Sequence, residues 1–250
     1  MKLPSRSAGI LCLLLTLPLP ALAQQADPAW SGVGYLQQGW PKNTNTNQQI
    51  RDNINTPFGT HFETWNDVPN VNLGLSVVRT VSPKWKVGIE ADWSSGSIGG
   101  TQQSQDFGLG PGSIYLQEKY QTYADLQVLV QVRPWGEEGR VVPFLSAAGG
   151  LAYDNDSTTM RFISSSGGGT TDLLRVTNHG FFPVLNVGIG MDVFLSARRL
   201  WFVETQLGYT WARLTRNAPA SGPGANGQPT VRDDTDDTGP NLLLGIGRRF

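Results

Sequence analysis

The chain has 250 residues, of which 39% are hydrophobic and 16% are charged, and its formal net charge is −1. This charge balance argues against nucleic acid as a partner, and a mean hydropathy of −0.23 excludes a membrane protein with many helices. The 30 glycines and 16 prolines interrupt helices, so the composition favours a loop-rich all-β protein.

The first 23 residues have the pattern of a secretory signal peptide. Lys2 and Arg6 give a positive end, an apolar stretch follows, and Ala21-Leu22-Ala23 forms a small-x-small cleavage site. We therefore expect residues 1–23 to be removed on export and residues 24–250 to form one mature domain. The only cysteine of the chain lies in the signal, so backbone pairing and burial, not disulfides, must stabilise the mature domain.

Eight runs of alternating apolar and polar residues follow the signal, with the period of two that is typical of β-strands. The run at 181–195 is the clearest, because all its odd positions are non-polar while Asn186, Gly188, Gly190 and Asp192 occupy even positions. In chain order the runs cover about 30–40, 71–81, 85–93, 122–133, 141–153, 181–195, 201–211 and 242–250.

The connections between these runs alternate in length. Short turns are expected at 82–84, 134–140 and 196–199, whereas the other four connections have about 25–30 polar and glycine-rich residues each. Short turns at one end and long loops at the other are typical of a transmembrane β-barrel. Residues 160–163 and 173–176 in the third long connection could extend strands above the membrane, and they leave a ten-stranded barrel open as an alternative to eight strands.

Aromatic residues indicate which face of the strands points outward. Alternation alone also fits a soluble lipocalin-like barrel, whose apolar face lies inside. However, aromatic residues bracket two runs at a spacing close to the ~25 Å apolar band of membrane barrels, as in the girdles that flank that band. We therefore predict an aromatic girdle and an apolar face toward lipid. The girdle residues are Trp85, Trp93, Trp201, Tyr209 and Trp211.

The opposite face of the runs carries bulky charged residues mixed with glycine. Side chains just fill the interior of an eight-stranded barrel, so we expect these charges to pair as a polar plug, with a gated narrow channel as the alternative. The predicted lumen cluster consists of Lys86, Glu90, Asp125, Arg133, Asp192 and Glu204, and Arg249 is a further candidate.

The C-terminal run resembles the assembly signal of bacterial outer-membrane proteins. Leu242, Leu244, Ile246 and the terminal Phe250 match that pattern, whereas Arg248 departs from it. With the signal peptide, the eight runs and the loop asymmetry, the mature chain resembles the OmpA/OmpX-type eight-stranded outer-membrane β-barrel family, which includes opacity-protein-like surface antigens. The resemblance covers nearly all of 24–250.

This resemblance implies an all-β, eight-stranded antiparallel up-and-down transmembrane barrel, without a further domain, in the outer membrane. The implied partners are outer-membrane lipid, lipopolysaccharide, the β-barrel assembly machinery and periplasmic chaperones, and the expected state is a monomer without a cofactor. The implied role is structural or interactive: envelope integrity, adhesion or ligand contact through four long loops. A narrow pore for small solutes is the alternative.

Two further patterns raise sharper hypotheses. Some barrels of this size modify lipid A, and His61 and His179, with serines in the loops, are candidates for such chemistry. No run places a histidine and a serine on one face at i, i+2, so we expect solvated histidines and no enzyme. Asp233, Asp234, Asp236 and Asp237 form an acidic run that is a candidate contact for Ca²⁺ or Mg²⁺, although a solvated acidic turn is the favoured interpretation because the spacing of a calcium loop is lacking.

Overall fold

The computed structural model describes residues 29–40, 61–62, 70–103, 111–166, 169–222, 230–236 and 238–250. The predicted signal peptide and most of the first long connection lie outside these residues. The described strands are β1 (Trp30–Gly39), β2 (Asn70–Ser82), β3 (Trp85–Gln103), β4 (Gly112–Val132), β5 (Val141–Ser164), β6 (Thr170–Phe194), β7 (Trp201–Ser221), β8 (Thr230–Asp236) and β9 (Gly239–Arg249).

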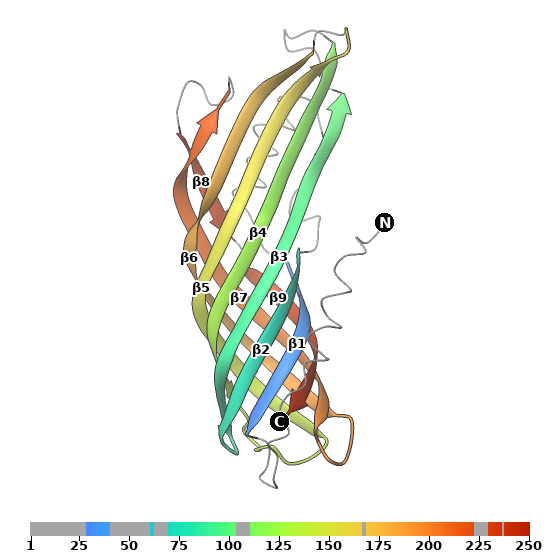
Figure 1. The fold of residues 1–250 in the computed structure, drawn as a ribbon, viewed down its shortest axis with the longest axis vertical. Helices are drawn as coiled ribbons and strands as arrows, with labels where there is room; N and C mark the ends of the chain where they lie inside the picture. Colours follow the sequence, from blue (N-terminus) through green and yellow to red (C-terminus); the bar gives the residue numbers. More distant parts are fainter. Residues whose placement is uncertain are drawn as a thin grey trace.

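Eight of the strands pair in a closed antiparallel ring, in the order β1-β2-β3-β4-β5-β6-β7-β9 and back to β1 (Figure 1). The first and last strands of the ring, β1 and β9, pair with each other, and further hydrogen bonds join Trp30 to the C-terminal Phe250. The Phe250 N–H donates to the Trp30 carbonyl at 2.9 Å, and the Trp30 N–H donates to the Phe250 carbonyl at 3.2 Å. A closed ring has no free strand edge. The eight-stranded prediction is therefore confirmed, and the ten-stranded alternative is wrong.

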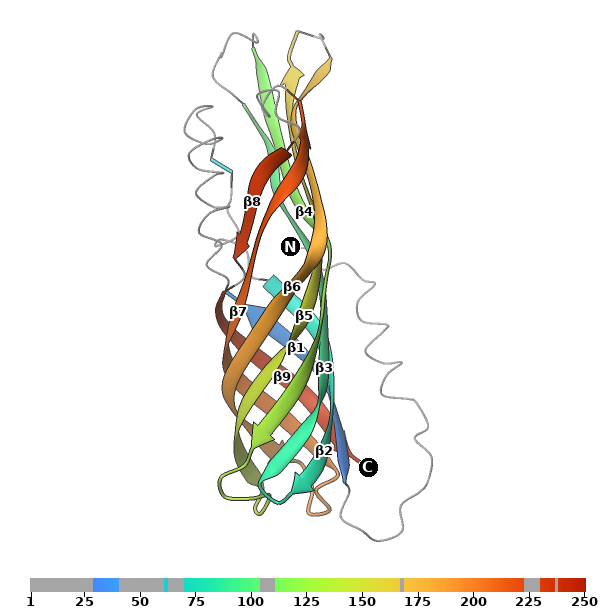
Figure 2. The ribbon, with the colours of Figure 1, turned by 90° about the vertical axis from the view of Figure 1, so that its left-hand side faces the viewer.

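The three predicted tight turns all lie at one end of the barrel, which we call the turn end, together with the C-terminus (Figures 1 and 2). They connect β2 to β3, β4 to β5 and β6 to β7. Within the described part of the chain, no helix is long and apolar enough to cross a membrane.

At the opposite end, strands β3–β7 continue past the ends of β1 and β9, as Figure 2 shows. We call these outer parts, together with β8, the extension. The strand β6 has 25 residues, whereas β1 has 10. The predicted long loops around 94–121, 154–178 and 212–241 are therefore largely wrong, because strand pairing continues through them, for example between Ile98 and Glu118 and between Thr159 and Arg175.

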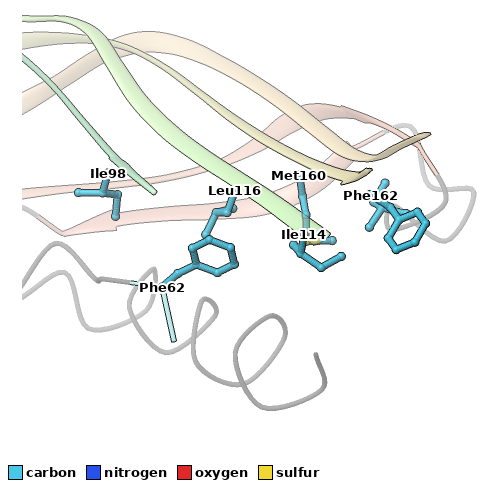
Figure 3. Packing of buried hydrophobic residues seen from close by; sticks show 7 residues of the cluster. Phe62, Ile98, Ile114, Leu116, Met160 and Phe162 are labelled. Atoms are coloured by element: carbon cyan, nitrogen blue, oxygen red, sulfur yellow. The ribbon is translucent and has the colours of Figure 1, made fainter. Parts of the chain in front are cut away.

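An apolar cluster explains why the extension is ordered as strands. Its members come from β3, β4, β5 and β6 and from the described part of the first connection, and Figure 3 shows the Phe62 ring directed toward Leu116. Burial of this cluster stabilises pairing in a segment whose Ser, Thr and Gly content is typical of loops. The cluster consists of Phe62, Ile98, Ile114, Leu116, Met160, Phe162 and Leu173.

The outer surface of the ring is an apolar belt. Large aliphatic side chains from every ring strand point outward there, including Leu36 of β1, while the alternate positions are buried inside the ring. This arrangement confirms the apolar-out prediction and excludes a lipocalin-like cup. Exposed members of the belt include Leu75, Ile89, Leu126, Val128, Leu151, Leu185, Ile189, Leu207, Leu244 and Ile246.

Candidate functional site in the barrel lumen

A network of ions fills the lumen at the turn end, and its centre is a residue of the β4–β5 turn. The Glu137 carboxylate contacts Lys86 Nζ at 3.1 Å, Arg249 Nη2 at 3.0 Å and Arg133 Nε at 3.6 Å. Lys86 Nζ also donates to Ser31 Oγ at 3.2 Å. The turn thus folds back under the lumen and places one carboxylate among three buried cations.

A second ion pair lies beside this network and spans one intervening strand, β5, on the inner face of the ring. Arg133 Nη2 donates to Asp192 Oδ2 at 2.6 Å and to Gln131 Oε1 at 3.2 Å. The side chains of Arg133 and Asp192 are only 1% and 0% exposed, so water does not screen their attraction. Arg133 follows β4 and Asp192 is in β6, so the pair connects strands that do not share backbone hydrogen bonds.

Further side-chain hydrogen bonds connect strands that are not neighbours in the ring. Ser146 Oγ of β5 donates to Gln206 Oε1 of β7 at 2.9 Å. Near the outer end, Asn241 Nδ2 of β9 donates to Asn186 Oδ1 of β6 at 3.4 Å. Each of these contacts spans one intervening strand on the inner face of the ring, and side chains just fill the interior of an eight-stranded barrel.

The cations around Glu137 lower the pKa of its carboxyl group. Burial alone would raise the pKa of the Glu137 carboxyl, but the neighbouring Lys86, Arg249 and Arg133 outweigh burial and hold that pKa below its usual value. Glu137 is therefore an anion at neutral pH, and it is the carboxylate that balances the cations at the turn end.

The six predicted lumen residues are all buried, but they do not form one cluster. Lys86, Arg133, Asp192 and Glu204 lie toward the turn end, and Glu204 faces Asp192 directly in the β6–β7 register. Glu90 and Asp125 lie further toward the extension. The expectation that every charge is paired is wrong for Glu90, Asp125 and Glu204, since none of the ion pairs among the described residues includes them.

Glu137 and Asp92 are lumen carboxylates that the predicted cluster does not contain. Glu137 lies in a turn, where alternation carries no signal, so only the folded path of that turn reveals it. Asp92 is on the polar face of its run and faces Asp125 in the β3–β4 register, so strand pairing was needed to bring the two together. The interior is also less polar than predicted, because aromatic and aliphatic side chains share it. These are Val33, Tyr35, Val142, Phe194, Phe202 and Leu243.

The predicted girdle residues lie on the outer surface, two at the turn end and three toward the extension. Trp85 and Trp201 begin their strands, while Trp93 and Trp211 are exposed further along and Tyr209 packs against Trp211 with ring centroids 4.7 Å apart. This is the arrangement of two aromatic bands around an apolar belt.

Two arginines on the apolar face rest on aromatic rings at the turn end. The Arg248 guanidinium lies 5.4 Å from the centre of the Trp201 ring, and the Arg79 guanidinium lies 5.8 Å from that of Trp30. Such contacts let a cation stay at an interface while its stem covers apolar surface. Among the residues predicted as an assembly signal, Leu242, Leu244, Ile246 and Phe250 all point outward.

The loop residues singled out in the sequence do not form a described catalytic or metal site. His179 is exposed on β6, and the exposed His61 donates its backbone N–H to Gln102 Oε1 at 2.6 Å. Asp233, Asp234 and Asp236 belong to β8, a strand and not a turn, while Asp237 lies outside the described residues. In the part of the chain that the structure describes, three or more His, Cys, Asp or Glu side chains are nowhere grouped to hold a metal ion.

Comparison with known proteins finds similarity in structure only. No protein-family model and no curated protein matches the sequence. Among solved structures, the outer membrane protein OprG from Pseudomonas aeruginosa is 15% identical with a TM-score of 0.48, and 90% of this chain and 97% of OprG are covered. Neisserial surface protein A is 8% identical with a TM-score of 0.43, and 90% and 100% are covered. Outer membrane protein W from E. coli is 12% identical with a TM-score of 0.40, and 91% and 100% are covered.

The ring of strand pairs, the apolar belt and the polar interior define the fold without reference to these proteins. Around the ring, the outer face carries large exposed apolar side chains and the inner face carries the buried charged ones, which is the reverse of a soluble protein. The chain therefore has the fold of an eight-stranded transmembrane β-barrel, the architecture of the OmpA/OmpX-type proteins that its sequence resembles.

Proposed function

We propose that the protein is an integral outer-membrane barrel with a closed lumen, whose role is structural or interactive and whose extension is its contact surface. The observation that carries the proposal is the apolar belt between two aromatic bands, combined with an interior of buried, cross-connected side chains. A belt of this kind is stable only in lipid. The turn end then faces the periplasm, and the extension faces outward from the cell.

The closed lumen argues against a pore. Conduction needs a continuous wet path, whereas Arg133, Asp192 and Lys86 are almost fully buried and are held by contacts across the interior. Moving them aside would leave unpaired charges in a region of low dielectric constant. We therefore place the activity of the protein on its outer surfaces, where it would contact lipid, lipopolysaccharide and extracellular partners.

Assembly is the second part of the proposal. The outward-facing Leu242, Leu244, Ile246 and Phe250 form the last strand of the ring, and Phe250 closes the ring on Trp30. We propose that the assembly machinery and periplasmic chaperones read this strand before closure. The alternating face would then be bound first by the machinery and later by lipid.

Fractionation of expressing cells tests the location and the barrel together. The protein should be recovered in the outer-membrane fraction, and an unheated sample should migrate differently from a boiled one on a denaturing gel because the closed barrel resists detergent. Recovery as a soluble periplasmic protein without a heat-dependent shift would overturn the proposal.

Planar-bilayer recording separates a plug from the alternative of a narrow pore. The purified, heat-modifiable protein should give no reproducible conductance steps. Regular steps in the wild-type protein would show that the lumen opens and would favour the pore.

Mass spectrometry of lipid A from expressing cells tests the enzyme hypothesis. A change in the number of acyl chains on expression would favour an enzyme.

A further inference from the structure

A small polar pocket lies where the complete ring ends and the extension begins. It has a volume of about 40 Å³ and includes Trp40 and Pro240 at the outer ends of β1 and β9, which are joined by a hydrogen bond of 3.0 Å from the Trp40 N–H to the Pro240 carbonyl. A polar cavity needs roughly 10–15 Å³ to hold one water. The pocket therefore has room for a small ion together with part of its water shell.

The wall of the pocket is rich in oxygen atoms. Two carboxylates, Asp92 and Asp125, face each other from β3 and β4, and five side-chain amides from β1, β2, β4, β6 and β9 also line the pocket. The oxygen-bearing residues considered below are Asn72, Asp92, Asp125, Gln127 and Asn241. Carboxylate and amide carbonyl oxygens are the ligands that Ca²⁺ takes in proteins.

Two of these amides have their nitrogens engaged in hydrogen bonds, one of them with a carboxylate of the pocket itself. Gln127 Nε2 donates to Asp125 Oδ1 at 3.1 Å, and Asn241 Nδ2 donates to Thr210 Oγ1 at 2.8 Å. With the nitrogens engaged, the carbonyl oxygens are left for the pocket. Among the described residues, the buried pocket oxygens without a hydrogen-bond partner are Asn72 Oδ1, Asp92 Oδ1, Gln127 Oε1 and Asn241 Oδ1.

Oxygens without donors are costly to bury, and here they surround negative charge. Gln127 and Asn241 are each 3% exposed, and Asp92 and Asp125 are more than nine-tenths buried. None of the ion pairs among the described residues gives these two carboxylates a cation. Glu90, buried two residues before Asp92, adds a further negative charge nearby. The pocket thus holds two carboxyl groups and four buried oxygens without a hydrogen-bond donor, and no described ion pair brings a cation to it.

We propose that this pocket is a divalent-cation site of the calcium type, in which Asp92, Asp125 and the carbonyl oxygens of Asn72, Gln127 and Asn241 are ligands. A bound cation supplies the positive charge that the two carboxyl groups lack and an electron-pair acceptor for the four oxygens without a donor. It also connects β2, β3, β4 and β9 at the level where the ring loses two of its strands, so binding would stabilise the rim of the barrel.

The ligand set predicts weak but selective binding. Two carboxylates with neutral oxygens give calcium dissociation constants of about 10⁻⁴–10⁻³ M, as in extracellular modules. Mg²⁺ needs a near-ideal octahedron at shorter distances and keeps its waters. It should therefore compete less well than Ca²⁺ in a pocket built from five side chains on four strands.

Terbium luminescence provides a direct test. The probe is Tb³⁺, which replaces Ca²⁺ and is excited through nearby aromatic rings; Tyr123 donates its hydroxyl to Asp125 Oδ2 at 3.1 Å and lies beside the site. The full chain is refolded into neutral detergent without lipopolysaccharide and checked by its heat-dependent gel shift. Saturable luminescence should appear, and millimolar Ca²⁺ should displace the ion, whereas Na⁺ at matched ionic strength should not.

Charge-removing variants of the same shape locate the site. Asp92→Asn and Asp125→Asn should each weaken terbium binding at least tenfold while keeping the gel shift. Two control variants remove carboxylates elsewhere. Glu204→Gln removes a buried lumen carboxylate outside the pocket, and Asp233→Asn/Asp234→Asn removes two of the aspartates on β8. Both controls should bind like the wild type. The proposal is overturned if the wild type shows no saturable signal, if Na⁺ displaces it equally, or if the signal follows the β8 carboxylates.

Discussion

Glu137 illustrates how single residues determine the state of the lumen. A buried cation is stable only near a counter-charge, and this one carboxylate serves Lys86, Arg249 and Arg133. The arrangement depends on a turn residue and not on a strand residue. The turn therefore acts as a charged cap on the end of the barrel.

Removal of this carboxylate should destabilise the barrel. In Glu137→Gln the three cations keep their burial but lose their shared anion, and we expect a loss of about 2–4 kcal/mol, reduced from the fully buried case because Glu137 retains some exposure. The measurement is the temperature at which the heat-modified band is half converted. Glu138→Gln, an exposed neighbour in the same turn, is the control and should melt like the wild type.

The same residue predicts a defined dependence on pH. The pKa of Glu137 is lowered in the folded protein, so the carboxylate stabilises the fold fully at pH values above the ordinary glutamate pKa of about 4.3. That contribution is lost as the pH falls through this value toward the lower folded pKa. The difference in melting temperature between the wild type and Glu137→Gln should therefore shrink on acidification below about pH 4.3. A constant difference from pH 7 to pH 3 would contradict this.

Glu204 makes a different prediction, because it faces another carboxylate. Glu204→Ala should lower the melting temperature, since it removes a buried side chain and leaves a cavity beside Asp192. Glu204→Gln keeps the volume and removes one of two adjacent acids, so it should be neutral or stabilising. An unchanged gel shift and melting point in Glu204→Ala would show that the side chain is not needed for packing.

At the scale of elements, the extension behaves as a second, smaller core above the ring. Its strands are held by backbone pairing and by the apolar cluster, in which Leu116 is fully buried. The ring below is held by closure and by lipid. The two parts should therefore differ in how they respond to a mutation.

Leu116→Ala should loosen the extension and spare the ring. Truncation of a buried leucine reduces stability by about 2–5 kcal/mol. We expect this loss to be large enough to open the strand pairs of the extension. Limited proteolysis of the folded protein should then cut within β3 and β4 beyond the ring, while the heat-dependent gel shift persists. Ile163→Ala, an exposed apolar residue of β5, is the control and should leave the extension resistant.

At the scale of the whole molecule, the apolar belt determines where the protein is stable. Trp85 and Trp93 bracket Ile89 on β3, and Ile89 is 54% exposed opposite Val128. The middle of the belt is the region where a charge is furthest from water. Near the turns, the natural Arg79 and Arg248 show that the outer face accepts a cation.

The destabilisation caused by an arginine substitution should therefore depend on how deep the position lies in the bilayer. Ile89→Arg should reduce the free energy of unfolding in lipid bilayers by about 2–4 kcal/mol. Val81→Arg, at a similarly exposed position next to the β2–β3 turn, should reduce it by only about 0–1 kcal/mol. Reversible denaturant titration in vesicles measures both. Equal costs at the two positions would mean that the belt does not span a bilayer.

The sequence alone predicts the ring strands, the end at which their turns lie and the face that points outward. Period-two alternation identifies the eight ring strands, and the short turns identify their shared end, because both are local properties of the chain. The aromatic spacing indicates which face meets lipid. The run at 181–195 corresponds to the ring part of β6 almost residue for residue.

Only the tertiary structure decides what the lumen and the extension contain. Long-range packing brings Lys86 and Arg249 to Glu137, and strand pairing brings Asp92 to Asp125. No spacing along the chain predicts contacts between a turn and two distant strands. The polar extension was predicted as loops because its strands are stabilised by a cluster assembled from five separate segments. Local composition reports which face a residue prefers, whereas the partner it meets there depends on strand register, and register exists only in the closed barrel.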